Sequence, residues 1–242
     1  MILGAGGDAN SSTLPVLIVT GLRQEARIAA GPGMTVVCSS SSPRQLREMM
    51  TSFDPACVRG IVSFGVAGGL DPELRSGDVV VATEVVTHER RWQAVAAARD
   101  GMVSLSGSGR PRVIGGILAG SEDVVLGPAV KAELRARTGA AAVDMESHIA
   151  ASYAEDNGLP FAAVRVISDP ASRSLPALAM DALKPDGKVD IWKVMRGIAI
   201  NPMAIPALVS AGRDFNRALR SLSGCRSLLL GSGSGGLVGA NL

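Results

Sequence analysis

The sequence predicts an α/β protein whose sheet is covered by helices on both faces. Segments with strand character alternate with segments of helical character along most of the chain. Most strand candidates are apolar throughout instead of alternating apolar and polar residues, which is typical of strands buried on both faces. Hydrophobic residues make up 47% of the 242 residues, enough for a sizeable core. In such sheets, ligands bind beyond the carboxyl ends of the strands.

The predicted strands are short apolar runs bounded by glycine or polar residues. They cover residues 15–20, 34–38, 58–64, 78–86, 112–119 and 161–167. The predicted helices use capping, proline and glycine signals at their ends, and they cover residues 22–30, 44–50, 128–138, 144–157, 175–183, 189–200 and 203–222. We expect residues 1–13 to form a flexible arm, residues 14–223 a single domain, and residues 224–242 a Gly/Ser-rich tail.

Composition excludes several classes of function. The net charge of +2 and an aromatic content of 3% are unlike a nucleic-acid-binding surface. The three widely spaced cysteines, Cys38, Cys57 and Cys225, predict neither a metal site nor a disulfide framework, and they fit a reducing cytoplasm. The first ten residues lack the apolar segment of a secretory signal, and no apolar run reaches about 18 residues. We therefore expect a cytoplasmic protein.

Asp169 is the most informative single residue. It follows the apolar run Phe161–Ile167 and Ser168, and Pro170 ends the strand. A carboxylate at the mouth of a buried strand is poorly solvated, so its pKa rises and it suits a general acid. The alternative is an Asp that caps the next turn through its own side chain.

Two further segments stand where predicted strands end. The cluster Gly65–Gly69 would let a flat ligand or an anion lie against the backbone, although a plain tight turn would have the same sequence. Glu146 stands at the start of a predicted helix, where Asp144 could be the cap. A carboxylate has two acceptor oxygens and suits a vicinal diol, and Met145 would supply a soft apolar surface beside a sugar.

These segments together resemble the superfamily of purine nucleoside phosphorylases and methylthioadenosine/adenosylhomocysteine nucleosidases. Three motifs occur in the family's order over about residues 16–172: Gly65-Val-Ala-Gly-Gly with Gly77-Asp78-Val-Val-Val, then Val143-Asp-Met-Glu146, then Arg165-Val-Ile-Ser-Asp169. The resemblance implies a three-layer α/β/α fold with a central mixed, partly barrel-like sheet. It also implies cleavage of a nucleoside, with a homo-oligomer expected.

The resemblance also implies roles for individual residues. Asp169, supported by Ser168, would protonate the purine at N7, and Glu146 would bind the ribose hydroxyls. Further substrate contacts would come from residues that match the family's base and sugar positions, namely Ala67, Gly68, Val125, Met145 and His88. Val125 is aliphatic where relatives stack an aromatic ring on the base, and His88 could equally be a surface histidine.

The nucleophile depends on the run Gly21-Leu-Arg-Gln-Glu-Ala-Arg27. Hydrolytic relatives carry a glutamate here, and Glu25 stands one position earlier than theirs. Arg23 and Arg27, with the backbone at Gly21, suit phosphate because guanidinium groups bind such anions through two nitrogens. All three charged residues could instead form a solvated helix face. We expect phosphorolysis with phosphate as co-substrate and without cofactor or metal; the alternatives are a hydrolytic nucleosidase and a non-catalytic nucleoside-binding protein.

A narrower resemblance, over residues 19–28 and 192–222, is to phosphorylase-like enzymes of bacterial hopanoid synthesis. It implies that the substrate is a 5′-modified adenosine such as adenosylhopane, which would release adenine. The basic amphipathic segment at residues 191–209, followed by Arg213, could lie on the surface of the inner membrane, or it could pack on the sheet or on another subunit.

Overall fold

The computed structural model describes residues 14–95, 111–174 and 205–226. The predicted helices at 175–183 and 189–200, the arm and the tail beyond residue 226 lie outside the described residues. In chain order the elements are β1 (Val16–Thr20), α1 (Arg23–Ala29), β2 (Met34–Cys38), α2 (Pro43–Thr51), a short 3₁₀ turn η2 (Pro55–Cys57), β3 (Ile61–Gly69), β4 (Val79–Val86), β5 (Arg91–Gln93), β6 (Val113–Gly120), α4 (Pro128–Thr138), β7 (Ala142–Asp144), α5 (Ser147–Asp156), β8 (Phe161–Asp169) and α8 (Ile205–Gly224).

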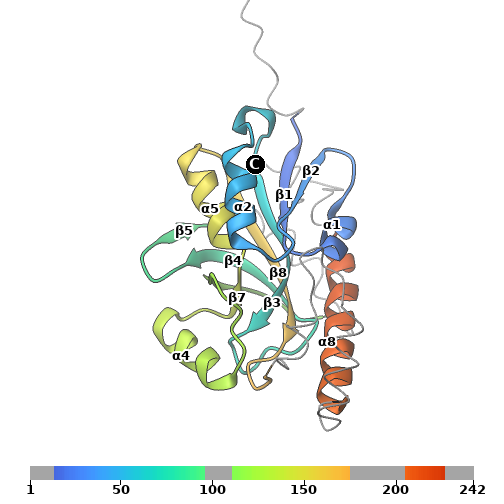
Figure 1. Ribbon diagram of the computed structural model, residues 1–242. Coiled ribbons are helices and arrows are strands. Elements are labelled where there is room, and N and C mark those ends of the chain that lie inside the picture. The colour runs from blue at the N-terminus through green and yellow to red at the C-terminus, as the bar shows by residue number, and fades with distance from the viewer. Residues whose placement is uncertain (1–13, 96–110, 175–204, 227–242) are drawn as a thin grey trace, which may run out of the picture.

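Five strands close into a barrel-like ring. Around the ring, β3 pairs with β7, β7 with β6, β6 with β4, β4 with β8, and β8 again with β3. The ring is mixed, since β3–β7 and β4–β8 are antiparallel and the other three pairs are parallel. Strands β1 and β2 extend the sheet from β3, and β5 extends it from β4 (Figure 1). The predicted mixed, partly barrel-like α/β fold is confirmed.

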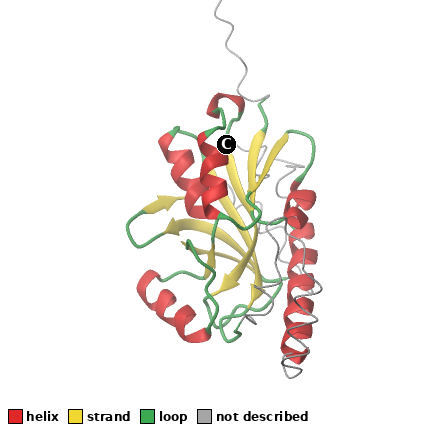
Figure 2. Cartoon of the chain, in the orientation of Figure 1, coloured by secondary structure: helices red, strands yellow, loops and turns green. Residues whose placement is uncertain are grey.

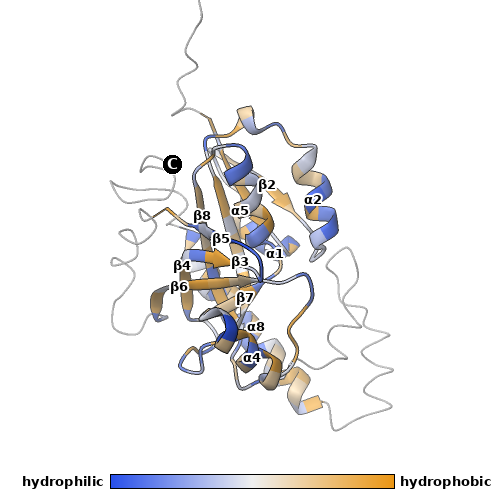
Figure 3. Ribbon diagram, turned by 90° about the vertical axis from the view of Figure 1, so that its left-hand side faces the viewer, coloured by the Kyte–Doolittle hydropathy of each residue, from blue (hydrophilic) through white to orange (hydrophobic). Residues whose placement is uncertain are grey.

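Strands β1, β3, β4 and β8 are largely buried on both faces, as their composition predicted, whereas β2 and β6 are only partly buried. One side of each strand packs with α2 and α5, where Leu17, Val19, Leu46 and Ile149 share a core cluster. The other side packs with α1 and α8 in a second cluster that includes Val16, Ile18, Ala29 and Leu222. Figures 1 and 2 show these helix pairs on opposite sides of the sheet. In Figure 3 the strands are mainly orange, whereas the helices carry both blue and orange segments.

The structure differs from the prediction mainly where strands end. Strand β3 continues through the glycine cluster to Gly69, so that cluster is strand and not a turn. Likewise β8 includes Ser168 and Asp169. Helix α5 begins at Ser147, because Asp144 belongs to the short strand β7. The sheet pairing of these residues outweighs their local turn and helix signals.

Strand β5 was not predicted. It has only three residues, and it pairs antiparallel with β4 so that Trp92 lies opposite Val85. Among the described residues, no helix is both long enough and apolar enough to cross a membrane.

Candidate active site

A pocket opens where β1, β3, β7 and β8 end. Most of the predicted site residues line it: Gly21, Glu25, Ala67, Gly68, Val125, Met145, Glu146, Ser168 and Asp169. Val124 and Val143 add apolar surface to the same pocket. Asp169 and Glu146 come from different strand ends, and they share this single cavity.

A bulge positions Asp169. Strand β8 pairs with β3 in regular register up to Ala67 and Ile167, and then Gly68 pairs with Asp169. Ser168 is therefore the extra residue, and a bulge of this kind turns the side chains of the strand end in a new direction. The Ser168 hydroxyl lies 3.2 Å from the carbonyl oxygen of Ala67 and 2.6 Å from Oδ1 of Asp169.

A lysine that the sequence analysis did not select contacts the other oxygen of Asp169. Lys131 Nζ lies 2.5 Å from Asp169 Oδ2, and its side chain is 0% exposed. Burial raises the pKa of the Asp169 carboxyl, while the charge and hydrogen bond of Lys131 and the hydrogen bond from Ser168 oppose that rise. Because a solvated lysine is the usual case on a surface helix, only the packing of α4 reveals this contact.

Glu25 enters the pocket from the first turn of α1. Its Oε2 accepts hydrogen bonds from the backbone N–H groups of Gly21 and Leu22, both at 2.8 Å, and its Oε1 accepts one from Val66 at 2.8 Å. The residue is 1% exposed. Burial raises the pKa of Glu25, against the opposing charge of Arg165 and these three hydrogen bonds. A buried carboxylate with a raised pKa suits a proton acceptor.

Glu146 lies beside a buried arginine that was also not selected from the sequence. Arg165 of β8 is 0% exposed, with Nε 3.0 Å from Asp144 Oδ2 and Nη2 3.4 Å from Glu146 Oε2. The same Nη2 donates to the hydroxyl of Ser63 at 2.6 Å. Burial disfavours the charged form of Arg165, but the charges of Asp144, Glu146 and Glu25 outweigh burial and raise its pKa.

Asp144 holds the turn that carries Glu146. Its Oδ1 accepts hydrogen bonds from the backbone N–H groups of Glu146 at 2.8 Å and Ser147 at 2.6 Å. Burial raises the pKa of Glu146 to about 7; Arg165 opposes the rise, and Asp144 and Glu25 add to it. Glu146 is therefore a carboxyl group that titrates near neutral pH inside the pocket.

Glycines allow these carboxyl groups to approach the backbone. A Cβ atom at Gly21 would lie 2.6 Å from Glu146 Oε1, and one at Gly65 would lie 2.7 Å from Glu25 Oε1. Both separations are far shorter than a carbon–oxygen contact, so larger residues at Gly21 and Gly65 would displace the two glutamates. The missing Cβ atom of each glycine is what lets a carboxyl group lie against the backbone at that position. Neither glycine has a positive φ.

Three predicted site residues lie elsewhere. Arg23 and Arg27 are exposed on α1 and do not line the pocket. Positions 23 and 27 are each about 200° around the helix from position 25, so they face solvent once Glu25 faces the pocket. His88 is exposed between β4 and β5, and it lines two other hollows of the surface. The placement gives no support to phosphate binding by the two arginines or to a substrate contact by His88 within this subunit.

Comparisons with known proteins agree with the fold. A family model described as "Phosphorylase superfamily" matches residues 16–185. The 5′-methylthioadenosine/S-adenosylhomocysteine nucleosidase of Marinomonas sp. (strain MWYL1) is 30% identical over 157 residues, which cover 56% of this chain and 66% of that protein. The nucleosidase of the same name from Treponema pallidum (strain Nichols) is 29% identical over 151 residues, covering 46% of this chain and 56% of that protein. The chain thus spans between about half and two thirds of the curated relatives' length.

Solved structures show the same architecture. The Helicobacter pylori 5′-methylthioadenosine/S-adenosylhomocysteine nucleosidase in complex with a substituted pyrrolidin-3-ol superposes with a TM-score of 0.63 at 17% identity, covering 90% of this chain and 96% of that chain. Futalosine hydrolase of the same organism gives a TM-score of 0.58 at 19% identity, covering 66% and 86% of the two chains. At these identities the likeness establishes the fold alone.

Proposed function

Because the chain belongs to the phosphorylase superfamily, we propose that it cleaves the N-glycosidic bond of a purine nucleoside. One observation carries the proposal: a candidate proton donor, Asp169, and a candidate diol acceptor, Glu146, line a single pocket at the strand ends. The same pocket is also lined by Glu25, whose carboxyl group can accept a proton from a nucleophile.

The base would bind beside Asp169. As the C1′–N9 bond breaks, the electron pair moves to the purine, and Asp169 gives its proton to N7, so the base leaves as a neutral molecule. Burial keeps the pKa of Asp169 above its ordinary value, which favours the protonated form required for this step. The side chains of Val124, Val125 and Val143 offer an apolar surface for a flat base.

The ribose would bind beside Glu146, whose carboxylate can accept hydrogen bonds from both the 2′ and the 3′ hydroxyl. Loss of the base leaves a sugar with oxocarbenium character, and nearby carboxylates stabilise its positive charge. Met145 lines the same pocket and supplies an apolar surface for the sugar.

The charges of the pocket favour water as the nucleophile. Among the residues that the structure describes, no arginine or lysine lines the pocket, and the buried Arg165 already serves Asp144, Glu146 and Ser63. Within the described part of the chain, a phosphate anion would meet the carboxylates of Glu25 and Glu146 without a cation of the pocket lining to balance it. Glu25 can take a proton from water while the water oxygen attacks C1′. This proposal therefore replaces the expected phosphorolysis with hydrolysis.

The substrate class follows from the relatives. The two curated nucleosidases are named for 5′-methylthioadenosine and S-adenosylhomocysteine, so we propose a 5′-modified adenosine here. A lipid-linked 5′ group such as that of adenosylhopane, peripheral membrane contact and a homo-oligomer are part of this proposal. Exposed Ile205 and Val209 at the start of α8 support membrane contact.

The test is release of free base from adenosines with different 5′ groups, each incubated with and without inorganic phosphate. We expect equal adenine release in both conditions and a free sugar product. Release that requires phosphate, with a sugar 1-phosphate as product, would establish phosphorolysis instead. Tight nucleoside binding without any base release would identify a non-catalytic binding protein.

Replacing the proton donor tests the chemical step. We expect Asp169→Asn to lower kcat on the order of 10²-fold or more, because an amide cannot supply the proton. Steady-state kinetics, with circular dichroism to check folding, measure this effect. Turnover near that of the wild type would contradict the role of Asp169.

A further inference from the structure

Lys131 is a fully buried cation beside the proposed proton donor, Asp169. Its side chain is 0% exposed, and all of its polar contacts go to the segment that follows the bulge of β8. Besides Oδ2 of Asp169 at 2.5 Å, Nζ lies 3.0 Å from the carbonyl oxygen of Pro170 and 3.3 Å from that of Arg173. Nζ also lies 3.4 Å from the carbonyl oxygen of Asp169. These four acceptor atoms at one strand end engage the three donors of the ammonium group.

Stability alone does not explain a lysine at this position. Moving an ammonium group out of water is costly, and an apolar side chain of similar size in place of a buried ion pair is often neutral or stabilising. A Met is of similar size and would be buried at this position without that cost. The charge therefore has a use that packing does not supply, and its nearest partner is the proton donor of the proposed reaction.

We propose that Lys131 is a positioning residue for Asp169, which orients the carboxyl group toward the base and balances the negative charge formed when the proton leaves. The inference rests on the proposed function. In the step itself, the O–H bond of Asp169 breaks, the N7–H bond forms, and the C1′–N9 electron pair goes to the base. Lys131 keeps its own protons throughout, and it stabilises the resulting carboxylate through a charge-assisted hydrogen bond.

The surroundings of Asp169 define the expected pH effect. Ser168 donates to it from β8, Lys131 contacts it from α4, and Asp214 of α8 acts on it as a like charge that raises its pKa. Asp214 is itself paired with Arg173 at 2.5 Å. Among the described residues, Lys131 is thus the cation in direct contact with Asp169. Without it, burial and Asp214 would hold the proton on Asp169 to higher pH and make it a weaker donor.

The experiment compares Lys131→Met, Asp169→Asn, the double variant and Arg137→Met over a range of pH. Arg137 is an exposed cation of the same helix, so Arg137→Met controls for loss of one charge from α4. We expect Lys131→Met to lower kcat roughly 10-fold to 100-fold with a smaller change in KM. We also expect the basic limb of the pH profile of kcat to move to higher pH. The double variant should be no slower than Asp169→Asn, because Lys131 acts only through Asp169.

Several outcomes would overturn the inference. It is contradicted if Lys131→Met has the same kinetics as Arg137→Met, or if the basic limb of its pH profile does not move. It is also contradicted if the losses of kcat in the two single variants multiply in the double variant. If Lys131→Met does not fold, Lys131→Arg decides: it keeps the cation, so the basic limb should stay at the wild-type pH even if kcat falls. A moved limb in Lys131→Arg would count against the inference.

A substrate whose leaving group needs no proton separates this inference from the proposed function. With 4-nitrophenyl riboside, Lys131→Met and Asp169→Asn should both turn over at rates near the wild type, whereas Glu25→Gln should remain slow. A large loss in Lys131→Met on this substrate would show a general structural role and overturn the inference. Failure of the wild type to release any base from nucleosides would instead contradict the proposed function.

Discussion

At the scale of residues, the site consists of two groups of buried charge. Asp169 has one cation, Lys131, at 2.5 Å, whereas Glu146 and Asp144 share Arg165 with Glu25 nearby. The second group has more acids than cations, so one carboxyl group is driven toward its neutral form. Burial is the main reason why Glu146 titrates near neutral pH, and the charges of Asp144 and Glu25 add to its effect.

The raised pKa of Glu146 makes stability depend on pH. Its pKa rises from 4.5 to about 7 on folding, so the folded protein binds the extra proton between those values. The stabilisation is complete below the lower pKa and is lost as the pH rises through the higher one. Between about pH 5.5 and about pH 8 we expect a loss on the order of 2 kcal/mol in the free energy of unfolding.

Glu146→Gln should remove this part of the pH dependence, since an amide does not titrate. Urea unfolding of both proteins at the two pH values measures the difference. Parallel pH profiles for the wild type and the variant would show that Glu146 is already ionised in the folded protein.

At the scale of elements, the bounds of strands decide which residues reach the pocket. The bulge at Ser168 turns Asp169, and the first turn of α1 brings Glu25 to the backbone of β3.

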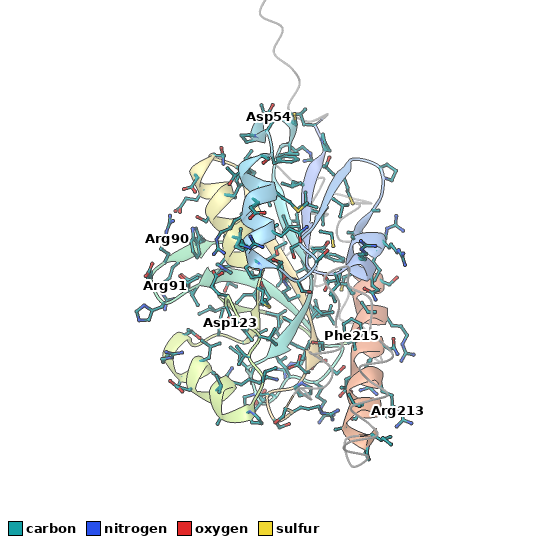
Figure 4. All side chains as sticks on the ribbon, viewed as in Figure 1. Asp54, Arg90, Arg91, Asp123, Arg213 and Phe215 are labelled. Carbon is teal, nitrogen blue, oxygen red and sulfur yellow. The ribbon has the colours of Figure 1, made fainter. Side chains whose placement is uncertain are left out.

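On α8, Figure 4 shows Phe215 on the side toward the sheet and Arg213 on the outer side. The buried side chains of this helix, Asp214, Ala218 and Leu222, recur at the spacing of one helical face.

Two glycine-to-alanine changes should affect different properties: one should lower activity, and the other should raise stability. Gly21→Ala places a Cβ atom 2.6 Å from Glu146 Oε1, so we expect the carboxyl group to shift and kcat/KM to fall on the order of 10-fold or more. Gly212→Ala in α8 meets nothing within 4 Å, so we expect it to stabilise the protein by about 0.5–1 kcal/mol through helix propensity.

Kinetics on a purine ribonucleoside and thermal unfolding together measure both variants. If Gly21→Ala has wild-type kinetics, Glu146 is not held where its ribose role requires. A destabilised Gly212→Ala would mean that α8 makes contacts at this position beyond those described.

At the scale of the whole molecule, Arg165 links the parts that the closed ring brings together. From β8 it reaches Ser63 of β3, Asp144 of β7 and Glu146 at the start of α5. Strand β8 lies between β3 and β4 in the ring, so its side chains enter a closed interior. The fold thus depends on a buried cation that neutralises acids from several elements.

Arg165→Met should destabilise the protein by about 3–5 kcal/mol, because it leaves buried carboxylates without a counter-charge. We expect a larger loss at about pH 8 than at about pH 5.5, where Glu146 is mostly protonated. Arg91→Met is the matched control, since Arg91 pairs with Glu84 at the surface and should matter by less than about 1 kcal/mol. Equal unfolding free energies for the two variants would contradict the central role of Arg165.

The amino-acid sequence by itself determined the fold class and most elements. Short continuous apolar runs rich in β-branched residues, such as Val16–Thr20, favour strands covered on both faces, and Pro43 and Gly139 mark the beginning and end of helices through local geometry. It also indicated Asp169, a carboxyl group at the end of a predicted buried strand, and Glu146, a carboxyl group at a predicted helix start, and the family motifs that contain them singled out both residues.

Only the tertiary structure decided which charged residues are buried. Lys131 and Arg165 are fully buried, whereas Arg23, Arg27 and His88 are exposed. Arg165 at least stands inside a predicted buried strand, but nothing in the local sequence of the helices separates Lys131 from Arg23 and Arg27. A helix of given sequence can turn any face toward the sheet, and a strand ending can carry a bulge or not. Those choices depend on contacts between residues far apart in the chain, and they set the direction and protonation of each side chain in the pocket.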